Sequence, residues 1–217
     1  MHKPLSTGAT IGILGGGQLG RMLSVAAARL GFRSHIFEPG IGCPASHVAD
    51  QLTTASYTDT DALQRFAETV DVITYEFENI PTSALDVLEQ VATIRPGREA
   101  LRISQDRLTE KDFLNSLGLK TAPYAAIDDA PALGAALNAF GTAAILKTRR
   151  FGYDGKGQVR LQPDSDPQAA VADLAGQAAL LEGFVDFSHE VSVIGARGAD
   201  GAVCCFDPGE NVHSDGI

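Results

Sequence analysis

The chain has 217 residues, of which 17 are Lys or Arg and 27 are Asp or Glu, giving a formal net charge of −10 at pH 7. No cluster of basic residues offsets this charge, and phosphate backbones require a concentrated positive surface, so nucleic acid is not an expected partner. The chain has no apolar run long enough to cross a bilayer and no secretory signal at its start, so we expect a soluble, cytoplasmic protein with no membrane partner.

The first hundred residues alternate between apolar runs and patterns with helical spacing. An apolar run predicts a strand at 9–15, and further strands are predicted at 32–38, 71–78 and 92–96. Helices are predicted between them, over 19–30, 59–70 and 80–91. This alternation is typical of a parallel sheet covered by helices, so residues 1–100 are expected to form a Rossmann-like α/β domain.

The pattern changes after this region. A helical pattern closed by Gly118 predicts a connector at 101–118. Helices are then predicted at 130–141 and 166–177, and strands at 143–149, 157–162 and 179–185. This order lacks the βαβ rhythm and favours an α+β domain over 119–186. The last segment, 187–217, contains a predicted hairpin turned by Gly198 to Gly201.

A glycine motif follows the first predicted strand. In "GILGGGQLGRML", Gly15-x-Gly17-x-x-Gly20 has the spacing of dinucleotide-binding turns, in which glycines allow a tight turn and close approach to a phosphate. Glu38 lies about twenty residues on, where such sites place an acidic partner for a ribose hydroxyl. Taken alone, the motif favours a nicotinamide or flavin enzyme.

A second glycine-rich stretch, "AILKTRRFGYDGKGQVRL", points to a different ligand. Lys147 leaves a buried strand, and three glycines and Lys156 follow within ten residues. Glycine amides that curve toward an anion, with ammonium groups beside them, are typical of phosphate binding. The stretch is not a P-loop, because neither Ser nor Thr follows Lys156 and a strand comes next.

Several stretches, in order, resemble the ATP-grasp superfamily and, within it, the N5-carboxyaminoimidazole ribonucleotide synthetase family. They span nearly all of the chain: "GILGGGQLGRML", "YEFENI", "QDRLTEK", "GYDGKGQ", "EGFVDFSHEVSVIGARG" and "NVHSDGI". The resemblance implies a pre-ATP-grasp domain that binds a ribonucleotide, followed by an ATP-grasp domain that is incomplete at its C-terminus. Its reaction would be the ATP- and bicarbonate-dependent carboxylation of aminoimidazole ribonucleotide in purine biosynthesis.

The resemblance also implies site residues. Aminoimidazole ribonucleotide would lie at the first glycine turn, whose helix N-terminus would face its phosphorylated ribose, and would contact Gln18, Leu19 and Glu76. ATP would be bound by residues of the second region, with Lys147 facing its phosphates and the backbone of 182–185 recognising adenine. The implied ATP contacts are Arg107, Lys147, Gly152, Tyr153, Asp154, Gly155, Lys156, Gly157, Gln158, Glu182, Gly183, Phe184, Val185, Glu190 and His213.

The implied chemistry has two steps. ATP phosphorylates bicarbonate to carboxyphosphate, and the ribonucleotide amine then captures the carboxyl group, directly or through released carbon dioxide. Tyr153, Asp154 and Lys156 match catalytic positions at the tip of a lid that would exclude water. No metal ligand is assigned within the chain. The Mg²⁺ ligands of the family are expected downstream of Ile217, so a protein of these 217 residues alone should be inactive; a homodimer is also implied.

Three alternatives remain at this point. A NAD(P)-dependent oxidoreductase would explain the first glycine motif and Glu38, but it leaves Lys147 and 152–158 without a role. Another ATP-grasp carboxylase or ligase, such as a formate-dependent transformylase or a biotin carboxylase, would explain the second stretch. A nucleotide-binding module without catalytic activity is the third alternative. Neither the three cysteines nor the scattered histidines have metal-ligand spacing.

Overall fold

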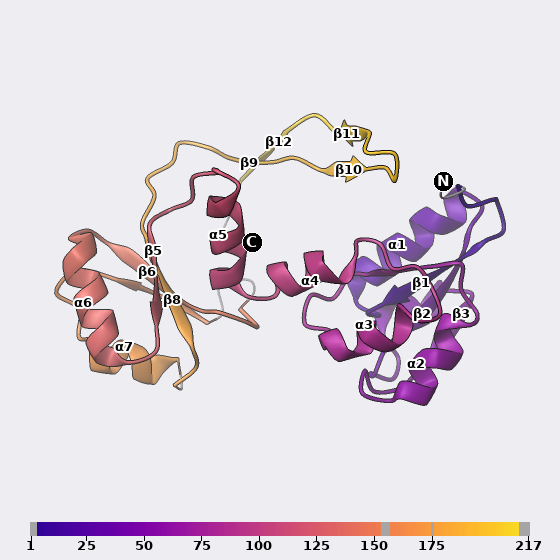
Figure 1. Cartoon of the computed structure of the whole chain (residues 1–217), viewed down its shortest axis with the longest axis horizontal. Helices are drawn as coiled ribbons and strands as arrows, with labels where there is room; N and C mark the ends of the chain where they lie inside the picture. Colours follow the sequence, from indigo (N-terminus) through magenta and orange to yellow (C-terminus); the bar gives the residue numbers. More distant parts are fainter. Residues whose placement is uncertain (1–3, 153–156, 175, 213–217) are drawn as a thin grey trace. The chain divides into compact units, whose positions relative to one another are not determined.

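The computed structural model describes residues 4–152, 157–174 and 176–212. The chain divides into two compact units, one ending at Gln105 and the other beginning at Asp106 (Figure 1). Each unit has its own sheet and its own hydrophobic core, so each is described by itself.

The first unit is built on a four-stranded parallel sheet with strand order β3-β2-β1-β4. Its strands are β1 (Thr10–Leu14), β2 (Arg33–Phe37), β3 (Gln51–Thr53) and β4 (Val72–Tyr75). Its helices are α1 (Gln18–Arg29), the 3₁₀ turn η1 (Pro44–His47), α2 (Thr60–Ala67), α3 (Thr82–Leu88) and α4 (Arg98–Ser104). The Rossmann-like parallel sheet predicted for this region is therefore confirmed.

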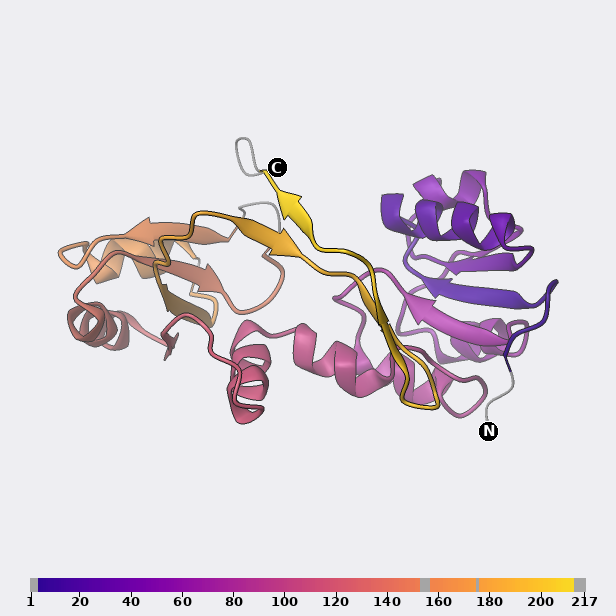
Figure 2. The ribbon, with the colours of Figure 1, turned by 90° about the horizontal axis from the view of Figure 1, so that it is seen from above.

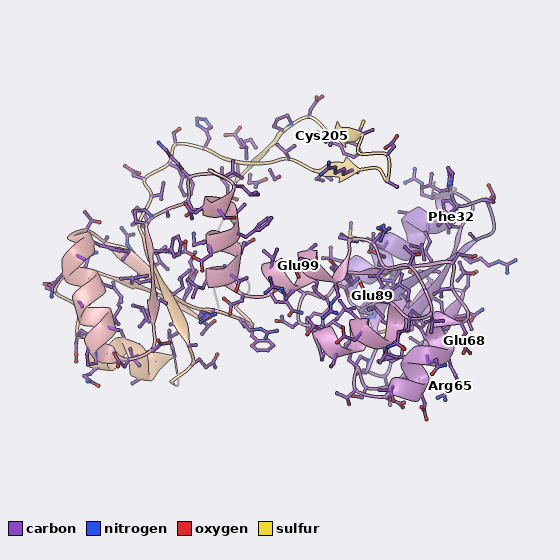
Figure 3. The ribbon with its side chains drawn as sticks, viewed as in Figure 1. Phe32, Arg65, Glu68, Glu89, Glu99 and Cys205 are labelled. Atoms are coloured by element: carbon purple, nitrogen blue, oxygen red, sulfur yellow. The ribbon has the colours of Figure 1, made fainter. Side chains whose placement is uncertain are left out.

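The two faces of this sheet bury different residues. Leu14 and Phe37 pack with the helix residues Leu63 and Phe66 in the larger core cluster. The alternate residues of the same strands belong to a second cluster with η1, as expected where a parallel strand is buried on both faces. Asp59 begins α2 because its carboxylate accepts from the Ala62 N–H at 2.9 Å. The labelled side chains of Arg65, in α2, and of Glu68, which directly follows it, are exposed and point outward (Figure 3).

One expectation for the first unit was wrong. Residues 92–96 form no strand, because the segment meets the sheet only through a parallel bridge between Ile73 and Ile94 before Pro96, which has no N–H to extend the ladder. The connector predicted at 101–118 is helical, but it contains the end of α4 and a separate helix, α5 (Arg107–Ser116). The Asp106 carboxylate starts α5 by accepting from the N–H groups of Leu108 and Thr109.

The second unit contains a four-stranded antiparallel sheet with strand order β5-β8-β6-β7. Its strands are β5 (Tyr124–Ile127), β6 (Ala144–Thr148), β7 (Gln158–Leu161) and β8 (Ala179–Gly183). Helices α6 (Ala130–Phe140) and α7 (Pro167–Asp173) lie on one face of this sheet, where they bury Leu146 and Leu181 (Figure 1). The predicted α+β fold is confirmed, and the opposite face carries the polar side chains discussed below.

The chain then forms an extended pair of strands. β9 (Glu190–Ser192) pairs with β12 (Gly209–Asn211), and β10 (Gly195–Arg197) pairs with β11 (Val203–Cys205), both antiparallel. Figure 2 shows the chain running out along β9 and β10 and returning along β11 and β12. The predicted hairpin is confirmed, because the Gly198 N–H donates to the Ala202 carbonyl at 2.8 Å across its turn.

Candidate functional site

The first glycine turn lies at the carboxyl edge of the parallel sheet. β1 ends at Leu14, and Gly15 follows with φ +106°, a left-handed conformation that side chains rarely adopt. The neighbouring strands β2 and β4 end at the same edge, because parallel strands share their direction. Glu38 directly follows β2 and Glu76 directly follows β4, so both carboxylates come from the strands that flank the turn.

Two carboxylates accept from the amides of this turn. The Gly16 N–H donates to Glu38 Oε2 at 2.8 Å, and the Gly17 N–H donates to Glu76 Oε1 at 2.8 Å. Glu38 Oε1 also accepts from the Gly40 N–H at 2.9 Å and so joins the turn to the loop after β2. The sequence predicts that these amides face a phosphate, but in the structure carboxylates already occupy the two N–H groups.

A cavity of about 480 Å³ lies beside this turn. Its lining residues are Gly16, Gly17, Glu38, Pro39, Cys43, Pro44, Tyr57, Glu76 and Phe77. Burial, together with the negative charges of Glu38 and Glu76, raises the pKa of Tyr57, so its hydroxyl stays protonated. The lining contains two carboxylates and no Lys or Arg, so its charge favours ligand groups that donate hydrogen bonds over phosphate.

The structure brings only one of the three predicted ribonucleotide contacts into this cavity. Glu76 lines the cavity, whereas Leu19 is 58% exposed on the first turn of α1. Gln18 lines a separate cavity of about 340 Å³ along the outer side of α1. Glu38 is the predicted partner of a ribose hydroxyl in a dinucleotide site, a role that the ATP-grasp interpretation does not require. In the structure it holds the turn through the N–H groups of Gly16 and Gly40.

Gly20 is the third glycine of the motif, and its surroundings leave no space for a side chain, so replacing it should lower the stability of the first unit. A Cβ at this position would lie 2.5 Å from the Gly15 carbonyl oxygen, so Gly20→Ala should force the turn apart and destabilise the first unit by about 2 kcal/mol. Urea unfolding followed by circular dichroism measures this loss. The control is Gly134→Ala, inside α6, where the new Cβ would lie 3.4 Å from Pro167 Cγ, an ordinary contact distance. Alanine favours a helix over glycine, so the free energy of unfolding should stay level or rise by up to about 1 kcal/mol. Equal stability of the two variants would contradict the close packing at Gly20.

The second candidate site lies on the face of the antiparallel sheet opposite α6 and α7. Lys147 pairs with Leu180 in the register of β6 and β8, and Ile145 pairs with Glu182, so the side chains of Lys147 and Glu182 share this face. Lys147 Nζ donates to Glu182 Oε2 at 2.8 Å. Gln158 pairs with Lys147 on the other side, so a third predicted ATP contact belongs to the same face.

A hydrogen-bonded network connects the start of α5 to the segment after β6. Arg107 donates through its guanidinium to the Gly152 carbonyl at 3.1 Å, and its N–H donates to the Arg149 carbonyl at 3.0 Å. Arg149 forms two hydrogen bonds to the Asp106 carboxylate, at 3.0 and 2.7 Å. Arg107 and Gly152, both predicted ATP contacts, are therefore brought together. Gly157, another predicted contact, is held by its carbonyl, which accepts from the Thr148 N–H at 2.8 Å.

Charge and burial act in opposite directions on Asp106. Burial alone would raise the pKa of this carboxyl, but the Arg149 hydrogen bonds and the N–H groups of Thr109 and Leu108 outweigh it and keep the pKa below its usual value. The carboxylate is therefore ionised at neutral pH, and it holds the Arg149 side chain at the start of the segment that carries Gly152.

The predicted adenine segment, 182–185, runs from the end of β8 into a loop. The Gly183 N–H donates to the Pro123 carbonyl at 2.8 Å, and the Phe184 N–H donates to the Ala143 carbonyl at 2.9 Å. Arg160 lies over the Phe184 ring at 4.3 Å from its centroid. These contacts fix the course of the segment. Glu190 lies at the start of β9, where its Oε1 accepts from Asn211 Nδ2 at 3.0 Å.

Five predicted site residues lie outside the described residues: Tyr153, Asp154, Gly155, Lys156 and His213. The structure also adds residues that sequence reasoning missed. Lys111 Nζ lies 3.5 Å from Glu182 Oε1, and Asp106 pairs with Arg149. Both acidic partners are distant in sequence, so no local pattern could have identified these pairs. Within the described residues, no group of three or more His, Cys, Asp or Glu could hold a metal ion, and no helix is long and apolar enough to span a membrane.

Comparisons with known proteins agree with this two-part arrangement. Residues 8–105 match the family model of the ribonucleotide synthetase preATP-grasp domain, and residues 112–217 match that of the ATP-grasp domain. N5-carboxyaminoimidazole ribonucleotide synthase of Brucella melitensis is 56% identical over 215 residues, which make up 98% of this chain and 59% of that protein.

Two solved structures share the fold. N5-carboxyaminoimidazole synthetase of Staphylococcus aureus, complexed with ADP, matches 98% of this chain and 57% of its own at 38% identity and a TM-score of 0.92. The Aspergillus clavatus enzyme, in complex with ADP and 5-aminoimidazole ribonucleotide, matches 97% of this chain and 55% of its own at 26% identity and a TM-score of 0.84.

These matches define the class of protein: the chain combines a ribonucleotide synthetase preATP-grasp domain with an ATP-grasp domain that follows it. The chain belongs to the N5-carboxyaminoimidazole ribonucleotide synthetase family, and it spans little more than half the length of these relatives. The resemblance and the predicted fold class are therefore both confirmed.

Proposed function

We propose that the protein carrying this chain catalyses the ATP- and bicarbonate-dependent carboxylation of aminoimidazole ribonucleotide to its N5-carboxyamino product, in purine biosynthesis. The observation that carries the proposal is the polar face of the antiparallel sheet, where Lys147 stands beside Glu182 and is 19% exposed. A positioned ammonium group on a sheet face suits the phosphates of a nucleotide. Support also comes from the relative of known structure that is complexed with ADP.

The nucleotide would lie along this face. Lys147 would approach its phosphate oxygens, Arg107 would hold the start of the 152–158 segment through Gly152, and that segment would cover the phosphates. The backbone of 182–185 would recognise adenine. Because Gly183 and Phe184 already donate their N–H groups within the unit, we assign the adenine hydrogen bonds to other backbone groups, including the Val185 N–H. Glu190 and His213 would complete the site.

The ribonucleotide would use the cavity at the first glycine turn. Because Glu38 and Glu76 supply acceptors there, the donor groups of the ligand, its hydroxyls and amine, would face these carboxylates, while its phosphate would point away. Gln18 and Leu19, on the exposed first turn of α1, would then contact the outer part of the ligand. The choice of aminoimidazole ribonucleotide as the ligand is supported by the Aspergillus clavatus enzyme, which is solved with this compound.

The reaction would proceed by two transfers. A bicarbonate oxygen attacks the γ-phosphorus of ATP, the bond from that phosphorus to the β-phosphate oxygen breaks, and ADP leaves. The ribonucleotide amine then forms a bond to the carboxyl carbon and loses a proton, while phosphate departs; this step is direct or passes through carbon dioxide. Tyr153, Asp154 and Lys156 would lie beside the reacting carbonate. Orientation and cationic charge supply most of the catalysis in such phosphoryl transfers.

Magnesium would contribute electrostatic stabilisation of the phosphates when bound. From the family resemblance, we propose that its ligands lie beyond residue 217. A homodimer in the cytoplasm is the assembly and location that the family resemblance implies.

Turnover by the full-length protein tests the proposal. ADP release should require both aminoimidazole ribonucleotide and bicarbonate, and the carboxylated product should be detected by mass spectrometry after brief reaction. NADH fluorescence serves as the counter-test, since saturable NADH binding without ATP binding would favour the oxidoreductase. ADP release that requires another compound in place of aminoimidazole ribonucleotide or bicarbonate would instead point to another ATP-grasp ligase.

Glu76 provides a sharper test of the ribonucleotide site. Glu76→Gln removes the charge that would accept from the ligand, so the KM for aminoimidazole ribonucleotide should rise about tenfold, while the KM for ATP stays level. Steady-state kinetics on the full-length protein measures both constants. The matched control is Glu78→Gln, two residues on, where the side chain is exposed and should leave both constants unchanged. A parallel rise in the KM for ATP would contradict a role confined to the ribonucleotide.

A further inference from the structure

Glu182 lies between two lysines of different elements. Lys147 Nζ, from the neighbouring strand β6, is 2.8 Å from Glu182 Oε2, and Lys111 Nζ, from α5, is 3.5 Å from Oε1. The side chains of Lys111, Lys147 and Glu182 are only 14%, 19% and 13% exposed. Charges this far withdrawn from water need nearby partners, because removing one partner leaves the other charge uncompensated.

Lys111 is held in place by the residues around it. Its helix is joined to β5 by the Tyr124 hydroxyl, which donates to Asp112 Oδ1 at 2.7 Å. Lys111 Nζ also lies 5.8 Å from the centroid of the Tyr124 ring, within the range of a cation–π contact. The ammonium group is therefore kept near the sheet face, although α5 has no buried residue.

Glu182 and a nucleotide polyphosphate would compete for Lys147. An ammonium group that turns toward phosphate oxygens must weaken its 2.8 Å hydrogen bond to Glu182. The carboxylate, 13% exposed, would then depend on its second cation. Lys111 already lies near the other carboxylate oxygen and can provide this compensation without moving far.

We propose that Lys111 is a positioning residue for nucleotide binding: by compensating the charge of Glu182, it allows Lys147 to turn to the phosphates. The proposal rests on the proposed function only in taking a nucleoside polyphosphate as the ligand of Lys147. Lys111 acts through Glu182, so its effect on affinity should depend on the charge of Glu182.

A double-mutant cycle measures this dependence. ADP binding to the full-length protein is followed by calorimetry for the wild type, Lys111→Met, Glu182→Gln and the double variant. Lys111→Met should weaken ADP binding by about five- to tenfold, a usual coupling for groups in contact, because Glu182 then retains Lys147. The affinity of Glu182→Gln is the baseline for the double variant, and adding Lys111→Met to it should change ADP binding by less than about twofold, because the neutral amide no longer holds Lys147. Lys111→Arg, which keeps the charge, should bind ADP nearly as well as the wild type.

Each other outcome is informative. If Lys111→Met weakens ADP binding by the same factor with and without Glu182→Gln, Lys111 acts on the ligand directly or at long range, and the proposal is overturned. An unchanged affinity of Lys111→Met overturns it as well. Melting curves of all variants identify losses caused by unfolding, and the rescue by Glu182→Gln would not arise from a purely structural role. A wild type that binds ADP without ribonucleotide-dependent turnover refutes only the proposed function, whereas one that binds no ADP refutes both.

Discussion

Lys147→Met should lower kcat/KM for ATP in the full-length protein by about a hundredfold or more, the usual cost of losing one preorganised group that stabilises transferring charge. The methionine keeps much of the side-chain length, so the sheet should remain packed, while Glu182 still has Lys111 at 3.5 Å. The KM for aminoimidazole ribonucleotide should stay within about twofold, because the cavity proposed for it is lined by residues of the first unit, whereas Lys147 belongs to the second. Steady-state ADP release with either substrate varied measures both effects.

Two further variants show whether charge or geometry matters. Lys120→Met removes an exposed lysine ahead of β5 and should leave the kinetics unchanged. Lys147→Arg keeps the charge but replaces a compact ammonium group with a planar guanidinium, so only part of the activity should return. If Lys147→Met bound ADP with unchanged affinity, the sheet face would not be the phosphate site, and the proposed function would lose its main support.

The sequence predicted the fold well where burial leaves a periodic pattern. β1 is buried on both faces and therefore appears as a nearly continuous apolar run. The prediction failed for β3, where Gln51 and Leu52 are exposed and only three residues pair at the sheet edge. It also failed for 92–96, whose β-branched residues resemble a strand, although only Ile94 bridges to the sheet. Strand pairing at an edge depends on tertiary contacts that a local pattern does not contain.

The candidate sites were predicted only in part, for a similar reason. The glycine spacing located the turn, but Glu38 and Glu76 meet its amides only because β2 and β4 both lie beside β1. Lys111 has the appearance of an ordinary surface lysine on a polar helix, and its contact with Glu182 bridges 71 residues of sequence. The residue types were readable from the sequence, whereas their charge partners required the fold. Whether the predicted site residues act as assigned stays a prediction.

Asp106→Ala should destabilise the second unit by about 2–3 kcal/mol at pH 7. Loss of the N-cap, which accepts from Leu108 and Thr109, accounts for about 1 kcal/mol of this. The remaining loss comes from the ion pair between Asp106 and Arg149, whose side chains are 19% and 26% exposed. Its contribution to stability should therefore lie between that of an exposed ion pair and that of a fully buried one. Urea unfolding followed by circular dichroism measures the loss. Asp129→Ala is the matched control, because Asp129 caps α6 through Ala132 alone, and it should cost only about 1 kcal/mol.

The pH dependence of Asp106→Asn isolates the ion pair, since asparagine still caps a helix but carries no charge. The pKa of Asp106 is lower in the folded chain than in the unfolded chain, so its charge contributes stability that is fully present above the unfolded value, about 3.9, and is lost as the pH falls through the folded value. The wild type should therefore exceed Asp106→Asn in stability at pH 7, and this difference should shrink below about pH 4. A difference that stays constant down to pH 2 would show that the carboxylate charge contributes nothing, and that Asp106 serves α5 only as a cap.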